Sequence, residues 1–508
     1  MLLRTLTALT LAITSVYSPA FATEKTLVYA LYGEPDSLDS AKAEAERSGH
    51  PIWLLCDTLV NISRDGQAVE AGLAESWSAS ADGLNVTLKL RPGALFHDGT
   101  AVDARAVKSS IERHYRPNHE LYSAEPRNTK EQMIRELVDS IQADGLTVVM
   151  RLKHPGLHYL SQVDIISPSA AARLGRDFGR QPVCSGPFRF ESWTKDKITV
   201  VANDRYWGGR PKIDRVVFRA MHEPKAIVDA LERGEVHYTP VVSDPIFFER
   251  LREAGLNLIT VPSLNVYYLG FYTDRAPFTN PALRRAIGQA VNVARTAQFL
   301  GRGAAIPARG PLPPAVKAYD PSVSQAAYDP DAARQGLARA GYGAGLTVSL
   351  VHHEGKSRDA EIAGAIQADL RRIGVTVDLV GKPTYGDLST AMRAREGNMF
   401  LYGWHVRAPY PERILVPLFH SRSAGATNFT RYSNPAVDRL IDEALRLPDG
   451  PEERRAFVQA QKLIVEDAPM VFLYHMTRVS VASRRVQNLE LNPGALPYDK
   501  LIRVQLTP

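Results

Sequence analysis

The alternation of strand-like and helix-like segments along the chain predicts an α/β fold. The clearest unit is a strand at Leu346–Val351, an amphipathic helix at Asp359–Ile373 and a second strand at Val375–Val380. A strand, a helix and a strand in this order place the two strands parallel in one sheet, with a right-handed crossover. The 508 residues also exceed what a single hydrophobic core commonly serves, so we expect two or three domains.

Local signals predict the other elements in order. Alternating apolar residues indicate strands, apolar residues at helical spacing indicate helices, and Pro or Gly marks their ends. The pattern predicts strands at Thr26–Tyr32, Val86–Leu90, Ile213–Phe218 and Met399–Tyr402, and helices at Asp103–Arg113, Ala332–Ala340, Pro435–Leu445 and Glu452–Val465. The segment Gly301–Pro321, rich in Gly, Ala and Pro, is expected to be an irregular loop inside a domain.

The N-terminus has the form of a secretory signal peptide over residues 1–22. Arg4 supplies the positive charge, Leu6–Val16 is mostly apolar, and Ala20–Ala22 is a small-residue cleavage site. The apolar run is shorter than the roughly 20 residues that span a bilayer. No Cys directly follows Ala22 to carry a lipid. We therefore expect an exported protein, cleaved near Ala22 and soluble in the periplasm.

Composition and motifs exclude several function classes. The formal charge of +6 is small for this length and no Lys/Arg run stands out, so nucleic-acid binding is not expected. The sequence has no nucleophile elbow, zinc-protease motif, phosphate-binding loop or dinucleotide fingerprint, so no enzyme or cofactor is predicted. The adjacent His352 and His353 end a predicted strand, where neighbouring side chains point apart, and no spaced cluster of metal ligands is present.

Cys56 and Cys184 are the two cysteines of the chain. In an oxidising compartment they could form one disulfide. They could equally be two buried, unpaired cysteines that act as small apolar residues. The residues alone leave both alternatives open.

Short motifs run in a fixed order over nearly the whole chain. They are Leu73–Trp77, Leu90–Gly99, Ser185–Phe188, Asn203–Pro211, Arg284–Ile287, Ile366–Leu370 with Ile373–Gly374, and Gly403–Trp404. In order and spacing they resemble the large periplasmic solute-binding proteins of the peptide/nickel class, family 5, which feed ABC importers. The resemblance runs from about Thr26 to the C-terminus.

The resemblance implies an α/β, two-lobe periplasmic-binding-protein fold of class II, large type, with an extra subdomain inserted in the first lobe. It places lobe I at residues 23–55, 185–262 and 478–508, the insertion at 56–184 and lobe II at 263–477. The segments near Ser263–Asn265 and Thr477 would then be hinges. It also puts Cys56 and Cys184 near the two ends of the insertion.

The pair Gly403–Trp404 gives the best indication of a ligand site. In similar proteins the loop after this pair lines the cleft, which here makes His405, Arg407, Tyr410 and Arg413 candidates. Dipeptide-binding members place an acid where this chain has Arg407. A guanidinium there suits a carboxylate or phosphate, whereas beside a buried ammonium it would lower affinity. The alternative is that Arg407 pairs with Glu412 or lies in solvent.

A second candidate segment is the basic loop after the strand Leu346–Val351. Its residues His353 and Arg358 could meet a ligand carboxylate, or the loop could simply be solvated. The aromatic residues near both segments could sandwich a ligand or fill the cores of the lobes; they are Trp404, Tyr402, Tyr410, Tyr267 and Tyr268.

These observations predict the solute-binding component of an ABC importer, working as a monomer with an inner-membrane permease and ATPase. The leading ligand class is a short peptide or an amino-acid-derived solute that bears an acidic group. Alternatives are a metal chelate or opine-like sugar conjugate, and, in another class, a periplasmic chaperone or adhesin that holds unfolded chains.

Overall fold

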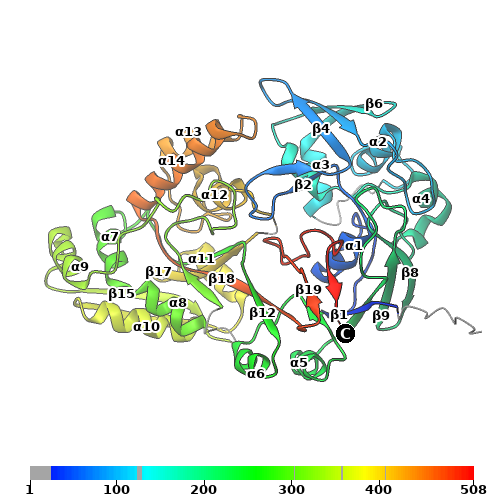
Figure 1. Ribbon diagram of the computed structural model, residues 1–508. Helices are drawn as coiled ribbons and strands as arrows, with labels where there is room; N and C mark the ends of the chain where they lie inside the picture. The colour runs from blue at the N-terminus through cyan, green and yellow to red at the C-terminus, as the bar shows by residue number, and fades with distance from the viewer. Residues whose placement is uncertain (1–23, 123–128, 302–303, 356–357, 407, 508) are drawn as a thin grey trace, which may run out of the picture.

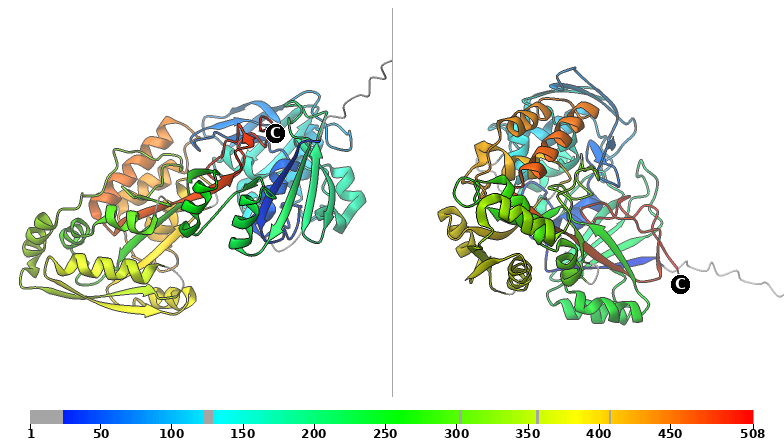
Figure 2. Two further views of the ribbon diagram at one scale, coloured as in Figure 1. Left: turned by 60° about the horizontal axis from the view of Figure 1, so that its bottom comes forward. Right: turned by 90° about the vertical axis from the view of Figure 1, so that its left-hand side faces the viewer.

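The computed structural model describes residues 24–122, 129–301, 304–355, 358–406 and 408–507 (Figure 1). The predicted signal peptide and Arg407 lie outside these ranges. Among the described residues, no helix has the length and apolar character needed to cross a bilayer. Figures 1 and 2 show two halves side by side, each built on part of one large sheet.

The first half, here called the β1 half, contains the N- and C-terminal parts of the chain. Parallel pairing joins β1 to β10, and β9 and β8 extend the sheet as antiparallel strands. Its elements are β1 (Thr26–Tyr32), α1 (Gly49–Leu55), α4 (Pro168–Leu174), β8 (Phe188–Thr194), β9 (Lys197–Ala202), β10 (Arg215–Met221), α5 (Pro224–Glu232), β11 (Tyr238–Thr239), α6 (Phe248–Glu253), β12 (Asn257–Pro262), β19 (Val486–Gln487) and β20 (Gln505–Leu506).

The second half, the β13 half, places helices on both faces of its sheet. One core packs α12–α14 against Phe400 and Phe472, and another packs α7 and α10 against Leu401 and Val471. Its elements are β13 (Asn265–Phe271), α7 (Pro281–Ala290), α8 (Val293–Gly301), β14 (Ala305–Pro307), α9 (Pro330–Leu337), β15 (Leu346–His353), α10 (Asp359–Arg371), β16 (Val375–Lys382), α11 (Tyr385–Ala394), β17 (Met399–His405), α12 (Glu412–Phe419), α13 (Pro435–Ala444) and α14 (Pro451–Asp467).

The strand β18 (Met470–Ala482) belongs to both halves. Residues 470–474 pair with β13, and residues 477–482 pair with β12. Its sequence is almost continuously apolar and most of its residues are buried, as expected for a strand covered on both faces. The step from β12 to β13 lies beside it, because Ser263 donates its backbone N–H to the Met476 carbonyl at 2.9 Å. The chain thus passes between the halves at two neighbouring points.

The predicted strand–helix–strand unit is confirmed. Strands β15 and β16 are parallel in continuous register, from Leu346 opposite Val375 to His353 opposite Lys382. The other predicted strands and helices are also present, with shifts of a few residues at their ends. The helix predicted over Ala332–Ala340, with its start at Asp329–Asp331 and its stop at Gly341, is also present: α9 begins at Pro330 and one wider turn follows it, in which Gly341 has a φ of 94°. Apart from β14, the described residues of the 301–321 segment form no strand or further helix.

Most of the segment between the two cysteines forms a separate layer with a core of its own, seen at the upper right of Figure 1, whereas its helix α4 packs into the core of the β1 half. Its sheet is antiparallel, in the order β4-β5-β7-β6. The elements are β2 (Val60–Ile62), β3 (Val69–Ala71), β4 (Ala74–Ala79), β5 (Asn85–Leu90), α2 (Ala104–Glu112), α3 (Thr129–Leu137), β6 (Val138–Asp144) and β7 (Thr147–Leu152). We call this segment the insertion.

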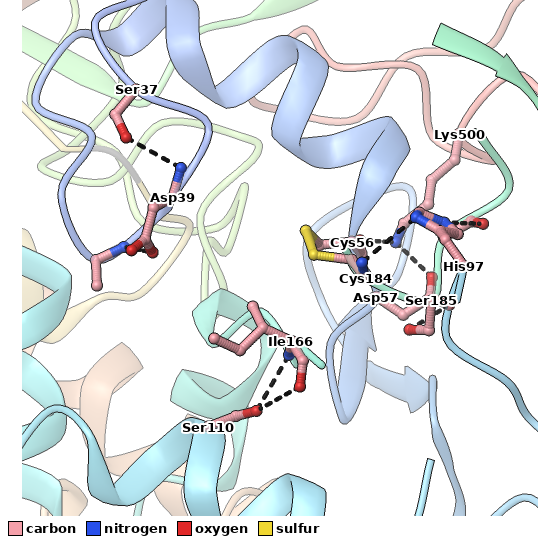
Figure 3. The surroundings of a disulfide bond; sticks show 12 residues. Ser37, Asp39, Cys56, Asp57, His97, Ser110, Ile166, Cys184, Ser185 and Lys500 are labelled. Atoms are coloured by element: carbon pink, nitrogen blue, oxygen red, sulfur yellow. Dashed lines mark hydrogen bonds and ion pairs between the residues drawn. A yellow bond between two sulfur atoms is a disulfide. The ribbon is translucent and has the colours of Figure 1, made fainter. Parts of the chain in front are cut away.

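A disulfide closes the root of the insertion. Cys56 and Cys184 are bonded, which decides the question that the sequence left open (Figure 3). The next residue, Asp57, is buried and its carboxylate accepts hydrogen bonds from Lys500 at 2.7 Å and Trp207 at 2.9 Å. Lys500 also donates to the Cys56 carbonyl at 2.6 Å. The C-terminal segment is therefore fastened to the point where the insertion leaves the β1 half.

At its other end, the insertion meets the β13 half through buried charges. His158 Nδ1 lies 3.0 Å from Asp449 Oδ1, and its Nε2 lies 3.5 Å from Glu412 Oε1. Lys317 pairs with Asp449 and, at 2.6 Å, with Glu453. Burial opposes the charged form of His158, but the carboxylates of Asp449 and Glu412 outweigh it and raise its pKa to about 9. We call this group of five residues the junction network.

Removing the disulfide should destabilise the protein. A Cys56→Ser/Cys184→Ser variant loses a crosslink that spans 128 positions of sequence, and we expect its free energy of unfolding to fall by about 2–5 kcal/mol. Urea unfolding of this variant and of the wild type, each with and without reductant, measures the change. Reductant should lower the midpoint of the wild type alone. Equal midpoints for all four samples would contradict the role assigned to the crosslink.

Raising the pH should weaken the junction network. Because the folded pKa of His158 is raised from 6.5 to about 9, its contribution is complete below pH about 6.5 and is lost as the pH rises towards 9. The free energy of unfolding should therefore decline over this window in the wild type. A His158→Gln variant should be less stable at pH 6 and should lack this part of the decline. The matched control is His154→Gln, since His154 is a nearby exposed histidine. A decline of equal size in both variants would count against the assignment.

Candidate functional site: a cleft between the two halves and the insertion

A cleft of about 300 Å³ lies where the β1 half, the insertion and the β13 half meet. The β1 half contributes residues from 40–53 and 492–496 together with Arg478, the insertion contributes residues from 58–63 and 161–164, and the β13 half contributes Leu264 and residues 406 and 408–410. Larger hollows, of about 600 and 440 Å³, flank the junction network and are lined by the insertion and the β13 half. The cleft is distinguished from these hollows because a molecule inside it could contact both halves at once.

The cleft wall of the β1 half carries an ion pair, and the buried histidine next to it is uncharged. Arg478 Nη1 lies 2.7 Å from Glu46 Oε1, and both side chains are partly exposed. Behind them, His50 is buried and its Nδ1 is 2.6 Å from the Tyr29 hydroxyl. Burial lowers the pKa of His50 to about 4, so the imidazole is neutral near pH 7. Trp53 adds an indole ring, whose Nε1 donates to the Pro497 carbonyl at 2.7 Å.

The β13 half ends in aromatic side chains beside the cleft. The Tyr267 ring stacks on Tyr474, with ring centres 4.6 Å apart, and its hydroxyl is 3.0 Å from His405 Nε2. Burial and the positive charge of Arg478 lower the pKa of His405, while Glu46 acts in the opposite direction. His405 does not line the cleft itself; it lies opposite Asn265, beside the crossing between the halves that leads to Arg478.

The predicted pair Gly403–Trp404 lies inside β17 and not in a loop after it, because this strand continues to His405. Tyr267 explains the glycine: a Cβ at position 403 would meet Tyr267 Cε1 at 2.6 Å. Trp404 is half-buried and donates its Nε1–H to the Arg413 carbonyl at 2.8 Å. The pair therefore shapes the end of the strand and the position of the chain that follows it.

The chain after β17 divides between the cleft and the insertion. Tyr410 lines the cleft but is almost fully buried in the core of the insertion, with its hydroxyl 2.8 Å from the His158 carbonyl and 2.9 Å from Ser161 Oγ. Arg413 is not in a loop, because α12 begins at Glu412; its guanidinium lies over the Tyr159 ring at 5.2 Å. Arg413 thus faces the junction with the insertion.

The second predicted segment lies at the ends of β15 and α10. His353 is buried and its ring is stacked on Tyr385, with centres 4.2 Å apart. Arg358 is exposed just before α10. Neither residue is part of the cleft lining described above. Within the described ranges, no three His, Cys, Asp or Glu side chains come together as a metal site.

Sequence reasoning missed the residues of the β1 half, above all Glu46, Arg478 and Trp53. Glu46 opens a single 3₁₀ turn, and Arg478 lies in the middle of an apolar strand, so neither belongs to a motif. Pairing of β18 with β11, and of β11 with β1, places Arg478 in the same half as the segment that follows β1 and contains Glu46 and Trp53.

Comparison with known proteins agrees with this arrangement. The family described as "Bacterial extracellular solute-binding proteins, family 5 Middle" matches residues 68–426. The glutathione-binding protein GsiB of Pectobacterium atrosepticum is 30% identical over 499 residues, which cover 95% of this chain and 94% of that protein. The heme-binding protein A of Haemophilus influenzae is 29% identical over 464 residues, which cover 86% of this chain and 84% of that protein.

Among solved structures, HbpA2 from Haemophilus parasuis superposes with a TM-score of 0.87 at 25% identity, covering 95% of this chain and 100% of that chain. The match extends over both halves and the insertion, so the shared architecture is that of the two-lobe, class II binding proteins. The chain therefore belongs to family 5 of the bacterial extracellular solute-binding proteins, the periplasmic components that supply ABC importers.

Proposed function

We propose that this protein binds a short peptide, or an amino-acid-derived solute that bears an acidic group, and delivers it to an inner-membrane permease and ATPase. The observation that carries the proposal is the cleft, which is lined by the β1 half, the insertion and the β13 half together. A solute held there contacts both halves, so its binding favours the closed arrangement of the two lobes.

We assign the chain segments to two lobes and an insertion. Lobe I comprises residues 23–55, 185–262 and 478–508, the insertion comprises 56–184, and lobe II comprises 263–477. The support is that the chain passes between the halves at Ser263–Leu264 and again at Met476–Thr477, where Pro262 pairs with Thr477. A rotation of one lobe about these two adjacent crossings changes few backbone angles, as hinges do.

The acidic character of the solute is supported by a cationic group in the cleft. Arg478 lies in the cleft wall, whereas Arg358, the other candidate cation, is exposed at the start of α10 and does not line it. A guanidinium presents planar, paired donors that fit a carboxylate. Closure removes water from such a contact and strengthens it. The relative that binds glutathione, a peptide with two carboxylates, supports the same class of solute.

The proposal also includes the place where the protein acts and its partner. The signal sequence sends the chain to the periplasm, where it acts as a monomer and passes its solute to the permease. The members of the family are solute-binding proteins and not enzymes, so we expect no turnover of chromogenic ester, amide or glycoside substrates.

A thermal-shift screen followed by calorimetry tests the solute class. Glutathione and other acid-bearing short peptides should raise the melting temperature, because a ligand present at 100 times its Kd stabilises the folded state by about 2.7 kcal/mol. Hemin, a nickel chelate and an opine-like conjugate serve as comparison ligands. If only hemin or the chelate raised the melting temperature, the proposed solute class would be wrong and the ligand that binds would take its place. Suppression of protein aggregation without any small-ligand shift would favour the chaperone alternative instead.

A further inference from the structure

The cleft contains one ion pair with both charges set in its wall, Glu46 with Arg478. Glu46 opens the 3₁₀ turn Glu46–Ser48, which leads into α1, and Arg478 lies in β18 just beyond the crossing between the lobes. Their side chains are 63% and 33% exposed. Each therefore has surface left to receive a ligand group while the pair stays intact. Such an exposed pair contributes little to stability, so the fold does not depend on it.

The pair brings a positive and a negative charge together on this wall, which also carries the exposed Glu44, and the insertion adds Asp164 to the cleft lining. The imidazole of His50 is neutral and already hydrogen-bonded to Tyr29, and Trp53 presents an apolar ring. The β13 half faces the cleft with Leu264, Val406 and residues 408–410. These residues are apolar apart from the Tyr410 hydroxyl, and a ligand group on the pair would be covered by them when the lobes close.

We propose that Glu46 and Arg478 form a subsite for the zwitterionic end of the ligand, with its ammonium on Glu46 and its carboxylate on Arg478. The proposal rests on the proposed function and narrows it to solutes that carry a free α-amino acid group. An isolated anion on Arg478 is repelled by Glu46, and an isolated cation on Glu46 is repelled by Arg478. A zwitterion laid antiparallel to the pair meets an opposite charge at both ends.

Closure of the lobes would make the charge match between this ion pair and the ligand selective for zwitterions. In the open cleft, water screens all four charges and the preference is small. Once the lobe II wall covers them, a ligand that lacks one charge leaves a protein charge desolvated and incompletely paired, which is unfavourable. The subsite should therefore select for the ammonium as well as for the carboxylate.

Calorimetric titration with glutathione and with N-acetylglutathione tests the proposal, because acetylation removes the ammonium and keeps both carboxylates. The wild type should bind glutathione at least about tenfold more tightly. Glu46→Gln should weaken the binding of glutathione by a similar factor but should tighten that of N-acetylglutathione, because the carboxylate on Arg478 is then no longer repelled. Arg478→Gln should weaken the binding of both peptides, and Arg478→Lys should restore part of the loss.

The matched control is Arg250→Gln, which breaks a 2.7 Å ion pair with Asp229 outside the cleft and should leave both affinities unchanged. Melting temperatures of all variants close to that of the wild type would establish that they fold. Equal affinity of the wild type for the two peptides, or equal effects of Glu46→Gln on both, would overturn the subsite while the proposed function stood. If neither glutathione nor any free dipeptide bound the wild type, the subsite and the peptide proposal would both fail.

Discussion

The structure depends on one shared strand. Strand β18 belongs to both halves of the large sheet, because its first residues pair with β13 and its last residues pair with β12. Its 13 residues therefore connect the two halves directly. The same strand positions the cleft. Tyr474 supports the Tyr267 ring in the β13 half, and four residues later Arg478 lies in the cleft wall of the β1 half. The two halves that the proposed closure would move are thereby joined by a few adjacent residues.

The insertion adds a second set of bonds between the same two halves. At its root, the disulfide and the Asp57–Lys500 pair fasten it to the β1 half. At its far end, the junction network fastens it to the β13 half through charges that are largely buried. Breaking one partner of a buried pair leaves the other charge desolvated, which commonly costs about 3–5 kcal/mol. The junction is therefore a contact that a modest movement should preserve.

The sequence predicted what depends on neighbours in the chain. The period of apolar residues located β15, α10 and β16, and the order of short motifs identified the family. It did not predict that β17 runs through Gly403 and Trp404, because the strand is extended by its pairing with β13, a segment more than 130 positions earlier in the chain. Tyr410 was a candidate ligand contact, yet its ring is largely buried in the core of the insertion, which no local pattern could reveal.

Sequence reasoning did not find the cleft residues of the β1 half for the same reason, because their position depends on contacts between distant parts of the chain. Glu46 and Arg478 are more than 400 positions apart, and each sits in a segment without a motif; they meet because β18 pairs with β11 and β11 pairs with β1, the strand before Glu46. The sequence could suggest that lobe II offers arginines to a carboxylate, since a resemblance supplied the loop. It could not suggest that lobe I offers an acid and a base side by side, and with them a reason to prefer a zwitterion.

The two attachments between the halves also restrict how the cleft can close. One attachment is the pair of crossings at residues 263–264 and 476–477, and the other is the junction network around His158 and Asp449. A rotation that preserves both sets of bonds must have its axis pass near both. Residues close to such an axis move little, whereas the distance across the cleft changes in proportion to distance from it. Glu46 and Arg478 both belong to the β1 half and Arg478 lies next to the crossings, so the proposed closure would leave their pair in place while the outer parts of lobe II moved over it. The zwitterion subsite would then be the fixed end of the cleft, and discrimination beyond it would fall to residues farther from the axis.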